Sequence, residues 1–309
     1  VLGGVMLASL LAAAALPHAF GDDALLFAAS YVALQVGRNA AAMSFLGRDH
    51  HLRDVFERIF VWSVISGALW LAGALFGGDD RLAFWLPAFI LDLGGPLAGY
   101  WLPGRGRAAT TDYDIEGGHF AERCQLFVLI ALGESIVVTG GTAAHHGLGA
   151  ADVGCLVLAF VETIALWWLY FGPAGEGPRQ ALLASADPGK LARDAYTYVH
   201  VVIVGGIVLV AVGDDLLVGD PGATLSGVAL AVVVAGPALF LAGTALFEWM
   251  TTRVANAPRL GVAALIVASA ALGAVLPTVA LCGIVTALLC GLAAWEIRAA
   301  GSARVALPV

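Results

Sequence analysis

Long apolar runs, separated by short polar breaks, are the main pattern along this chain. A membrane-spanning helix needs about 20 mostly apolar residues, and ten runs approach or reach that length. They are Val1–Pro17, Ala24–Phe45, Arg58–Phe76, Leu82–Leu102, Ala121–Thr142, Asp152–Phe171, Asp194–Val212, Leu225–Phe247, Leu260–Val275 and Thr278–Ile297. The breaks hold turn-forming residues, as in Gly219–Gly222, and the runs lack the alternation of β-strands. The pattern therefore predicts an all-α, polytopic transmembrane helix bundle with about ten spans.

The composition agrees with a membrane protein. Hydrophobic residues make up 60% of the 309 positions and charged residues only 12%, whereas soluble domains carry about 25% charged residues. The four cysteines (Cys124, Cys155, Cys282 and Cys290) lie inside apolar runs without CxxC spacing. We therefore interpret them as small core residues rather than redox or metal-binding groups. The chain is expected to form a single integral membrane domain over residues 1–309.

The distribution of basic residues predicts the orientation of the helices. Twelve of the fifteen lie in alternate connections or in the C-terminal tail: Arg48, Arg53, Arg58, Arg105, Arg107, Arg179, Lys190, Arg193, Arg253, Arg259, Arg298 and Arg304. The opposite connections carry Arg81 alone, together with aspartates that include Asp214 and Asp215. Because basic loops remain on the cytoplasmic side, we expect a protein of the bacterial cytoplasmic (inner) membrane with a cytoplasmic C-terminus.

A short internal echo suggests a repeat. Ala19–Asp23 ends the first predicted helix and Ala211–Asp215 ends the seventh, both with the letters GDD. A spacing of six helices would give both copies the same orientation, as in a parallel six-helix repeat. The halves would be 1–102 and 119–298, with a chance match between two polar turns as the alternative.

Ionisable residues inside the apolar runs are the candidate functional groups. Glu134 is the most informative, because an ionisable group near the bilayer centre costs roughly 2.5–3.5 kcal/mol, and we expect it to face protein or water. Arg123 lies eleven residues earlier, close to three helical turns, so both side chains should share one helix face. The predicted intramembrane polar cluster, a candidate proton, ion or substrate site, comprises Arg38, Asp92, Glu122, Arg123, Glu134, Glu162 and His200.

The polar cluster has two interpretations. It could form a polar pathway in which Asp92, Glu134 and Glu162 are the acids and Arg38 and Arg123 the counter-charges. Alternatively, the same residues could form structural ion pairs that fix the register of the helices.

Other motifs give little support to catalysis or to bound cofactors. The pairs His50-His51 and His145-His146 have no partner at zinc-site spacing, and no phosphate-binding loop, dinucleotide fingerprint or GxSxG motif is found. We therefore expect no metal, no cofactor, no nucleic-acid partner and no catalytic residue. The expected partners are the lipid bilayer and a small solute or ion, and the sequence leaves the oligomeric state open.

One segment resembles a known family. The run His119–Arg123, followed by Leu126–Val128 and Leu132–Ile136 (HFAER, LFV and LGESI), is similar to the signature helix of the bacterial low temperature requirement A (LtrA) family. Further matches lie at Pro17–Gly21, Tyr31–Arg38, and Tyr198 to His200.

The resemblance implies a topology more than a mechanism. Members of this family begin with a helix bearing an acidic, Phe-rich motif and continue with a Trp-rich helix, and neither is found here. The resemblance therefore implies a member lacking about two N-terminal spans, with twelve in the complete protein. It also implies a connection with growth at low temperature, without an assigned substrate.

Three functions are open at this point. The first is a transporter with a polar interior, the second a structural or adaptor protein of the membrane, and the third an intramembrane enzyme acting on lipid. Convergence of Asp92, Glu134 and Glu162 on one cavity would favour transport, and scattered ion pairs would favour the adaptor. A lateral opening lined by acids or histidines would favour the enzyme.

Overall fold

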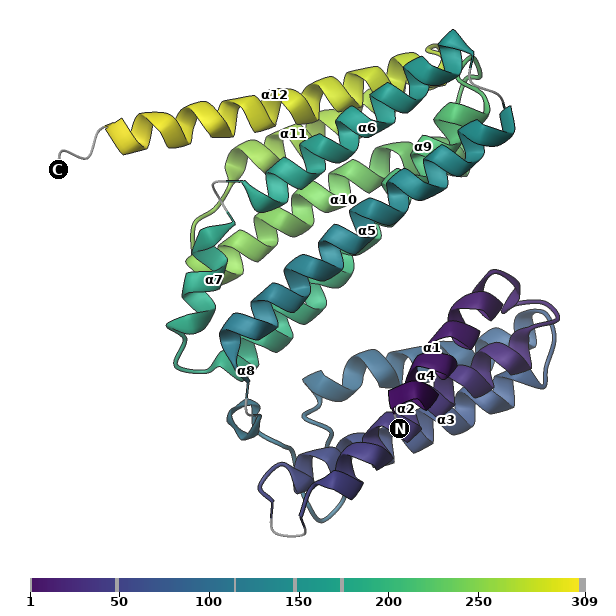
Figure 1. The fold of residues 1–309 in the computed structure, drawn as a ribbon, viewed down its shortest axis with the longest axis vertical. Helices are drawn as coiled ribbons and strands as arrows, with labels where there is room; N and C mark the ends of the chain where they lie inside the picture. Colours follow the sequence, from purple (N-terminus) through teal and green to yellow (C-terminus); the bar gives the residue numbers. More distant parts are fainter. Residues whose placement is uncertain (1, 48–49, 114, 147–148, 173–174, 306–309) are drawn as a thin grey trace. The chain divides into compact units, whose positions relative to one another are not determined.

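The computed structural model is built from helices (Figure 1). It describes residues 2–47, 50–113, 115–146, 149–172 and 175–305. Contacts divide the chain into two compact units, Val1–Asp114 and Ile115–Val309, and each unit is described by itself below. The expected all-α fold is confirmed.

The N-terminal unit is a set of four main helices with two short 3-10 turns. Its elements are α1 (Leu2–Ala15), η1 (Leu16–His18), α2 (Ala24–Phe45), α3 (Arg53–Ala74), α4 (Asp79–Leu97) and η2 (Thr110–Asp112). Helix α2 packs against α1 and α3, and α3 packs against α4. The core combines Ala24, Ala28 and Ala88 with the rings of Trp70 and Trp85. Small side chains let the helix backbones approach closely, while the tryptophans fill the remaining space.

A buried arginine fixes the loop that follows α4. The Arg58 guanidinium donates hydrogen bonds to the carbonyl oxygens of Gly106 and Arg105, at 2.7 and 2.8 Å. It also pairs with Asp54 one turn earlier in α3. The sequence places Arg58 among the charges of a connection, whereas in the structure its buried side chain holds the loop after α4 against α3.

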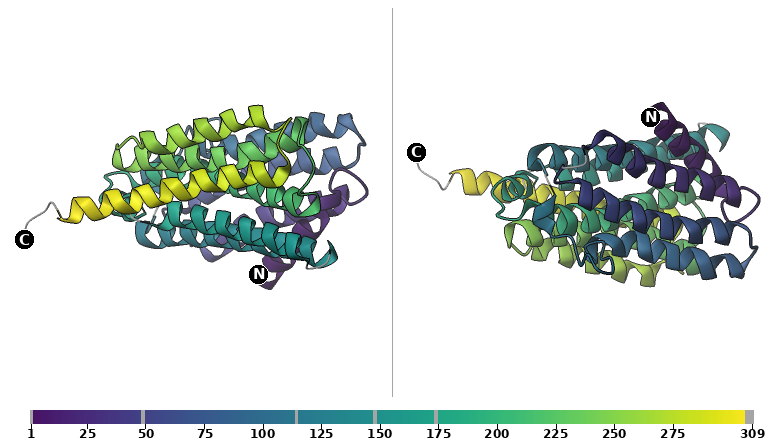
Figure 2. Two further views of the ribbon diagram at one scale, coloured as in Figure 1. Left: turned by 90° about the horizontal axis from the view of Figure 1, so that it is seen from above. Right: turned by 90° about the horizontal axis from the view of Figure 1, so that it is seen from below.

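The C-terminal unit is a larger bundle. Its elements are α5 (Gly117–His146), α6 (Ala150–Phe171), α7 (Glu176–Leu183), α8 (Pro188–Leu191), the π-helical stretch η3 (Ala192–Val199), α9 (His200–Gly219), α10 (Gly227–Thr252), α11 (Ala257–Ser269), η4 (Ala270–Leu272) and α12 (Thr278–Val305). Helices α5, α6, α9, α10 and α12 run alongside one another (Figures 1 and 2). Helix α9 packs against both α5 and α10, and α6 packs against α5 and α12.

Glycines bring α9 and α10 into close contact. A Cβ atom added to Gly206 would lie 2.6 Å from the backbone nitrogen of Phe240, and one added to Gly236 would lie 2.7 Å from that of Val210. Neither position has room for a side chain, so these two backbones touch along their length.

Each of the ten predicted spans overlaps a helix or a continuous pair of helical elements. Six of the described helices are long and apolar enough to cross a membrane by length and composition: Arg53–Ala74, Gly117–Ala144, Ala150–Phe171, Pro188–Gly219, Gly227–Thr252 and Thr278–Gly301. Leu2–His18 and Ala257–Leu272 are shorter apolar helices. The membrane character is thus supported, while the number ten stays a prediction.

The predicted repeat also stays a prediction, and the echo that suggested it does not mark equivalent helix ends. Gly21–Asp23 forms the turn between η1 and α2, whereas Gly213–Asp215 lies within α9, which continues to Gly219. The predicted orientation is likewise untested, and Arg48, one of the basic residues on which it depends, lies outside the described residues.

Candidate functional site

Two carboxyl groups line one small cavity inside the C-terminal unit, which we call the carboxyl cavity. Glu162 comes from α6 and Asp214 from α9, and their residues are only 5% and 3% exposed. The cavity has a volume of about 10 Å³, which is close to the space that one water molecule requires. Its remaining lining residues are Val210, Gly213, Val233, Cys282 and Val285. No basic side chain lines the cavity among the described residues.

Hydroxyl groups contact both acids. Thr286 on α12 donates a hydrogen bond to Glu162 Oε2 at 3.1 Å. The Ser135 hydroxyl on α5 lies beside Asp214, yet Ser135 Oγ and Asp214 Oδ2 make no hydrogen bond of standard geometry within the described part of the chain. An unpaired buried polar atom costs about 1–3 kcal/mol. A water molecule, a proton or a cation in this cavity would therefore be stabilised.

Asp214 is a site residue that sequence reasoning missed. The sequence Gly213-Asp214-Asp215 is typical of a turn and therefore predicts that Asp214 lies in a connection. In the structure α9 runs on through Leu216–Val218, which places Asp214 more than one turn inside the helix. The signal was the apolar stretch after the aspartates, followed by a stronger turn sequence at Gly219–Gly222.

Glu134 does not line this cavity. Its side chain is exposed on α5, as is that of Arg123, and the expectation that Glu134 faces protein or water stays a prediction. The two residues do share one helix face, together with the exposed Phe127, Ile130 and Val137. The buried face of α5 carries the neighbouring Ser135 instead, because adjacent residues on a helix point about 100° apart.

Asp92 belongs to a separate polar network in the N-terminal unit. Its Oδ2 atom accepts hydrogen bonds from Tyr31 Oη and Trp70 Nε1, both at 2.9 Å. Gln35 donates to Tyr31 Oη at 3.0 Å, and the exposed Arg38 donates to Gln35 at 2.9 Å. The expected pairing of Arg38 or Arg123 with an acid of the cluster is not found among the described residues.

His200 and Glu122 lie toward the other end of the C-terminal bundle. His200 is buried, with Nδ1 placed 3.2 Å from the Ala195 carbonyl oxygen and Nε2 placed 2.7 Å from Tyr170 Oη. This arrangement fits a neutral ring that donates from Nδ1 and accepts the tyrosine proton. Glu122 is exposed, at 3.5 Å from His119 and 3.9 Å from Arg179.

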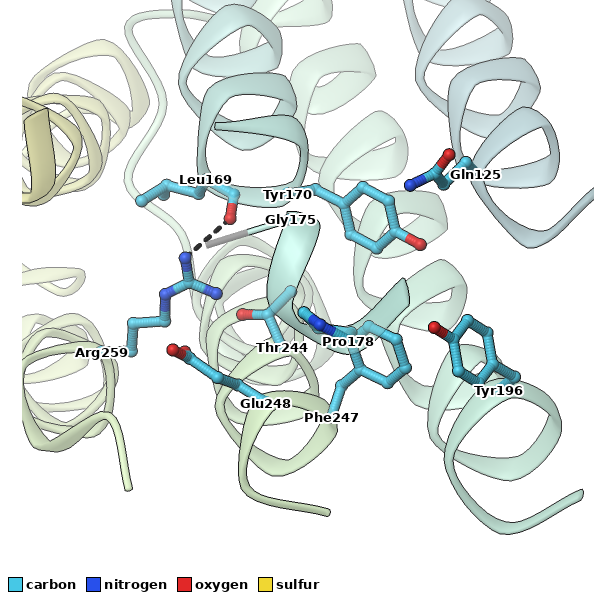
Figure 3. Close-up of a pocket in the computed structure, with 10 residues that line it drawn as sticks. All are labelled: Gln125, Leu169, Tyr170, Gly175, Pro178, Tyr196, Thr244, Phe247, Glu248 and Arg259. Carbon is cyan, nitrogen blue, oxygen red and sulfur yellow. Dashed lines mark hydrogen bonds between the residues drawn. The ribbon is translucent and has the colours of Figure 1, made fainter. Parts of the chain in front are cut away.

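Tyr170, the hydrogen-bond partner of His200, also lines a second cavity, the polar chamber (Figure 3). Its volume is about 20 Å³. Figure 3 shows Gln125, Tyr170 and Tyr196 on one side of it and Glu248 and Arg259 on the other.

An ion pair closes the Arg259 side of this polar chamber. The Arg259 guanidinium donates two hydrogen bonds to Glu296, at 2.7 and 2.9 Å, and one to the carbonyl oxygen of Leu169, at 2.8 Å. Both residues of the pair are buried, so α6, α11 and α12 are joined at this level.

The predicted cluster is thus distributed over several places. Glu162 alone, of the seven predicted residues, lines the carboxyl cavity, where Asp214 joins it. Within the described residues, no group of three or more histidine, cysteine, aspartate or glutamate side chains is arranged to hold a metal ion.

Comparison with known proteins identifies the family. Residues 1–294 match the family described as bacterial low temperature requirement A protein (LtrA). An uncharacterized protein of Rhizobium meliloti (strain 1021), RA0937, is 34% identical over 251 residues, which cover 81% of this chain and 61% of that protein. The chain therefore spans about three fifths of the length of this relative, and no solved structure matches it. With a match over almost its whole length, this chain belongs to the bacterial low temperature requirement A family.

Proposed function

We propose that this protein is a proton-linked membrane transporter in which Glu162 and Asp214 bind and release a proton or a small cation. The observation that supports this proposal is the shared cavity, in which two buried carboxyl groups meet without a basic side chain. Two like charges in a medium of low polarity repel each other and lose their hydration. At least one group must therefore carry a proton, or the pair must hold a cation.

The position of the two acids also favours movement of the bound ion. Glu162 is on α6 and Asp214 on α9, while Thr286, the hydroxyl donor to Glu162, is on α12. A relative shift of these helices would change the distance between the acids, and with it the affinity for a proton. In this proposal the protein lies in the cytoplasmic membrane with its C-terminus in the cytoplasm, and transport supports growth at low temperature.

A lipid-acting enzyme has less support. Two open grooves lie on the surface of the C-terminal unit, of about 710 and 560 Å³. The first is lined by residues such as Val157, Pro221 and Val279, and the second by residues such as Leu265, Leu288 and Trp295. Neither groove has an acid or a histidine among its described lining residues. Such surfaces suit acyl chains, but they offer no group for general acid or base catalysis.

The proposal is tested by proton flux into proteoliposomes that contain the purified protein and a pH-sensitive dye. Glu162→Gln and Asp214→Asn keep the side-chain shape but remove the titrating group, so each should lower proton flux by about tenfold or more. Glu134→Gln is the matched control, because this glutamate is exposed on α5, and it should leave the flux close to that of the unaltered protein.

Two results would contradict transport. The first is a flux no higher than in empty liposomes, across the pH gradients tried, which would favour the adaptor. The second is unchanged flux in Glu162→Gln with a normal amount of folded protein. That result would leave the carboxyl pair as a structural hydrogen-bonding site.

A further inference from the structure

The contact between α5 and α9 changes from apolar to polar along its length. Ser135, Thr139 and Thr142 are spaced by four and three residues, so they lie on one face of α5. Ser135 and Thr139 are buried and Thr142 is half-buried. On α9, Asp214 and Asp215 occupy the corresponding half of the helix. Ser135 lies beside Asp214 and Thr142 beside Asp215, while the Thr139 hydroxyl between them donates to the Ser135 carbonyl oxygen.

These polar side chains lead away from the carboxyl cavity. Thr142 Oγ1 donates a hydrogen bond to Asp215 Oδ1, and Asp215 is half-buried rather than enclosed. Ser135, two turns earlier on α5, lies beside Asp214, whose Oδ2 atom is unpaired and 97% of whose residue surface is buried. Seven residues of helix span about 10 Å. Polar atoms thus continue from the cavity to a partly accessible carboxylate near the end of α5.

The opposite side of the cavity is closed by apolar side chains. Between the carboxyl cavity and the polar chamber of Figure 3, each packed helix contributes a fully buried apolar residue: Val128, Leu166, Ile207, Phe240 and Leu289. All five belong to one continuous core. A close-packed apolar layer holds no water and offers no hydrogen bond to a proton or a cation.

We infer that, in the conformation of this structure, the carboxyl pair exchanges its proton or cation only with the membrane face at which α5 ends and α6 begins, with Asp215 and Thr142 as the access residues. This inference rests on the proposed function and adds the route to its site. Asp215 supplies negative charge at the outer end of the route, and the hydroxyl of Thr142 orients that carboxylate. The apolar layer is the barrier toward the face that carries Arg179 and Lys190.

Two natural cysteines make the route measurable without any transport assay. Cys282 lines the carboxyl cavity, while Cys124 lies beyond the apolar layer, 3.7 Å from the Tyr196 carbonyl oxygen. We would keep one of them at a time and replace the other cysteines with alanine. Silver ions, which are small, cationic and thiol-reactive, would be added to right-side-out and inverted membrane vesicles. The protected fraction is then read by labelling the denatured protein with a maleimide.

Cys282 should be protected several-fold faster when silver is added to the face at which α5 ends. Cys124 should show the reverse preference, and an introduced Asp220→Cys, exposed just after α9, identifies that face. Thr142→Val and Asp215→Asn should both slow the protection of Cys282, whereas Thr142→Ser keeps the hydroxyl group and should leave the rate close to that of the unaltered protein. Thr251→Val is the matched control, because the Thr251 hydroxyl bonds only to carbonyl oxygens of α10 in the described structure.

Equal protection of Cys282 from both faces would overturn the inference, as would no protection from either. Unchanged protection in both Thr142→Val and Asp215→Asn would exclude these residues as the access route. Failure of the proposed function is distinguishable from these results. One-sided protection of Cys282 without proton flux would reject the proposed transport and support the access route. Proton flux that depends on Glu162, together with protection of Cys282 from both faces, would support transport and reject the access route.

Discussion

Removing the acid of the Arg259–Glu296 pair should be among the most destabilising single changes in the C-terminal unit. Arg259 and Glu296 are 3% and 8% exposed, and Arg259 makes two hydrogen bonds to the carboxylate and one to the carbonyl oxygen of Leu169. Glu296→Leu would leave a buried guanidinium without its counter-charge. Breaking a buried pair in this way costs about 3–5 kcal/mol.

The expected effect can be converted to a melting temperature. One kcal/mol shifts the midpoint of a domain of this size by about 2–4 °C, so Glu296→Leu should lower it by roughly 6–20 °C. The measurement is thermal unfolding of the detergent-solubilised protein, followed by the loss of its monodisperse size-exclusion peak. Glu122→Gln is the control, because the Glu122 side chain is 53% exposed and 3.9 Å from Arg179. An exposed pair of this kind contributes at most about 1 kcal/mol.

A double variant separates the charge effect from a general loss of packing. Replacing both members, as Arg259→Met with Glu296→Leu, removes the unpaired charge and keeps apolar volume, so most of the lost stability should return. If the double variant melts as low as Glu296→Leu, the instability comes from packing or from the Leu169 contact. The argument from an unpaired buried charge would then be refuted.

Two further stability predictions follow from close contacts. Gly236→Ala should lower the free energy of unfolding by about 1–3 kcal/mol through overpacking, because the added Cβ would lie 2.7 Å from Val210 N. Gly205→Ala is the control, because a Cβ at Gly205 would meet open space and should leave the stability unchanged. Equal melting temperatures of the two variants would contradict this reasoning. Asp92→Leu should lower the free energy of unfolding by about 1–3 kcal/mol, because Trp70 Nε1 would lose its hydrogen-bond acceptor. Asp92→Asn keeps an acceptor oxygen and should retain more stability. Equal melting temperatures of the two variants would show that these hydrogen bonds do not stabilise the unit.

The sequence predicted the helices well because a helix that spans a membrane is recognised by its length and apolar content alone. It does not predict which face of each helix is buried, and α5 shows why. A helix of a membrane bundle is apolar on the side that meets lipid and on the side that meets protein, so hydrophobic periodicity does not distinguish the two. Exposed Ile130 and buried Leu132 carry the same signal in the sequence, although they point in different directions.

The candidate site was only half predictable for a related reason. Glu162 stands in a long apolar run and is therefore conspicuous, whereas Asp214 is preceded by glycine and followed by a second aspartate, which favours a turn locally. The packing of α9 against α5 overrides that local preference and continues the helix past it. Pairings such as Arg259 with Glu296 depend on how distant helices meet, and no local pattern encodes them.

The glycine-lined contact between α9 and α10 has a consequence for how this bundle could change shape. Where two backbones touch, as at Gly206 and Gly236, side chains cannot rearrange to let one helix slide past the other. The two helices should therefore move together as one rigid body, a plate formed by α9 and α10. Any rocking motion must then occur where this plate meets α6 and α12. Since Asp214 belongs to the plate and Glu162 to α6, the same motion would set the separation of the two acids, and so couple the shape of the bundle to the occupancy of its cavity.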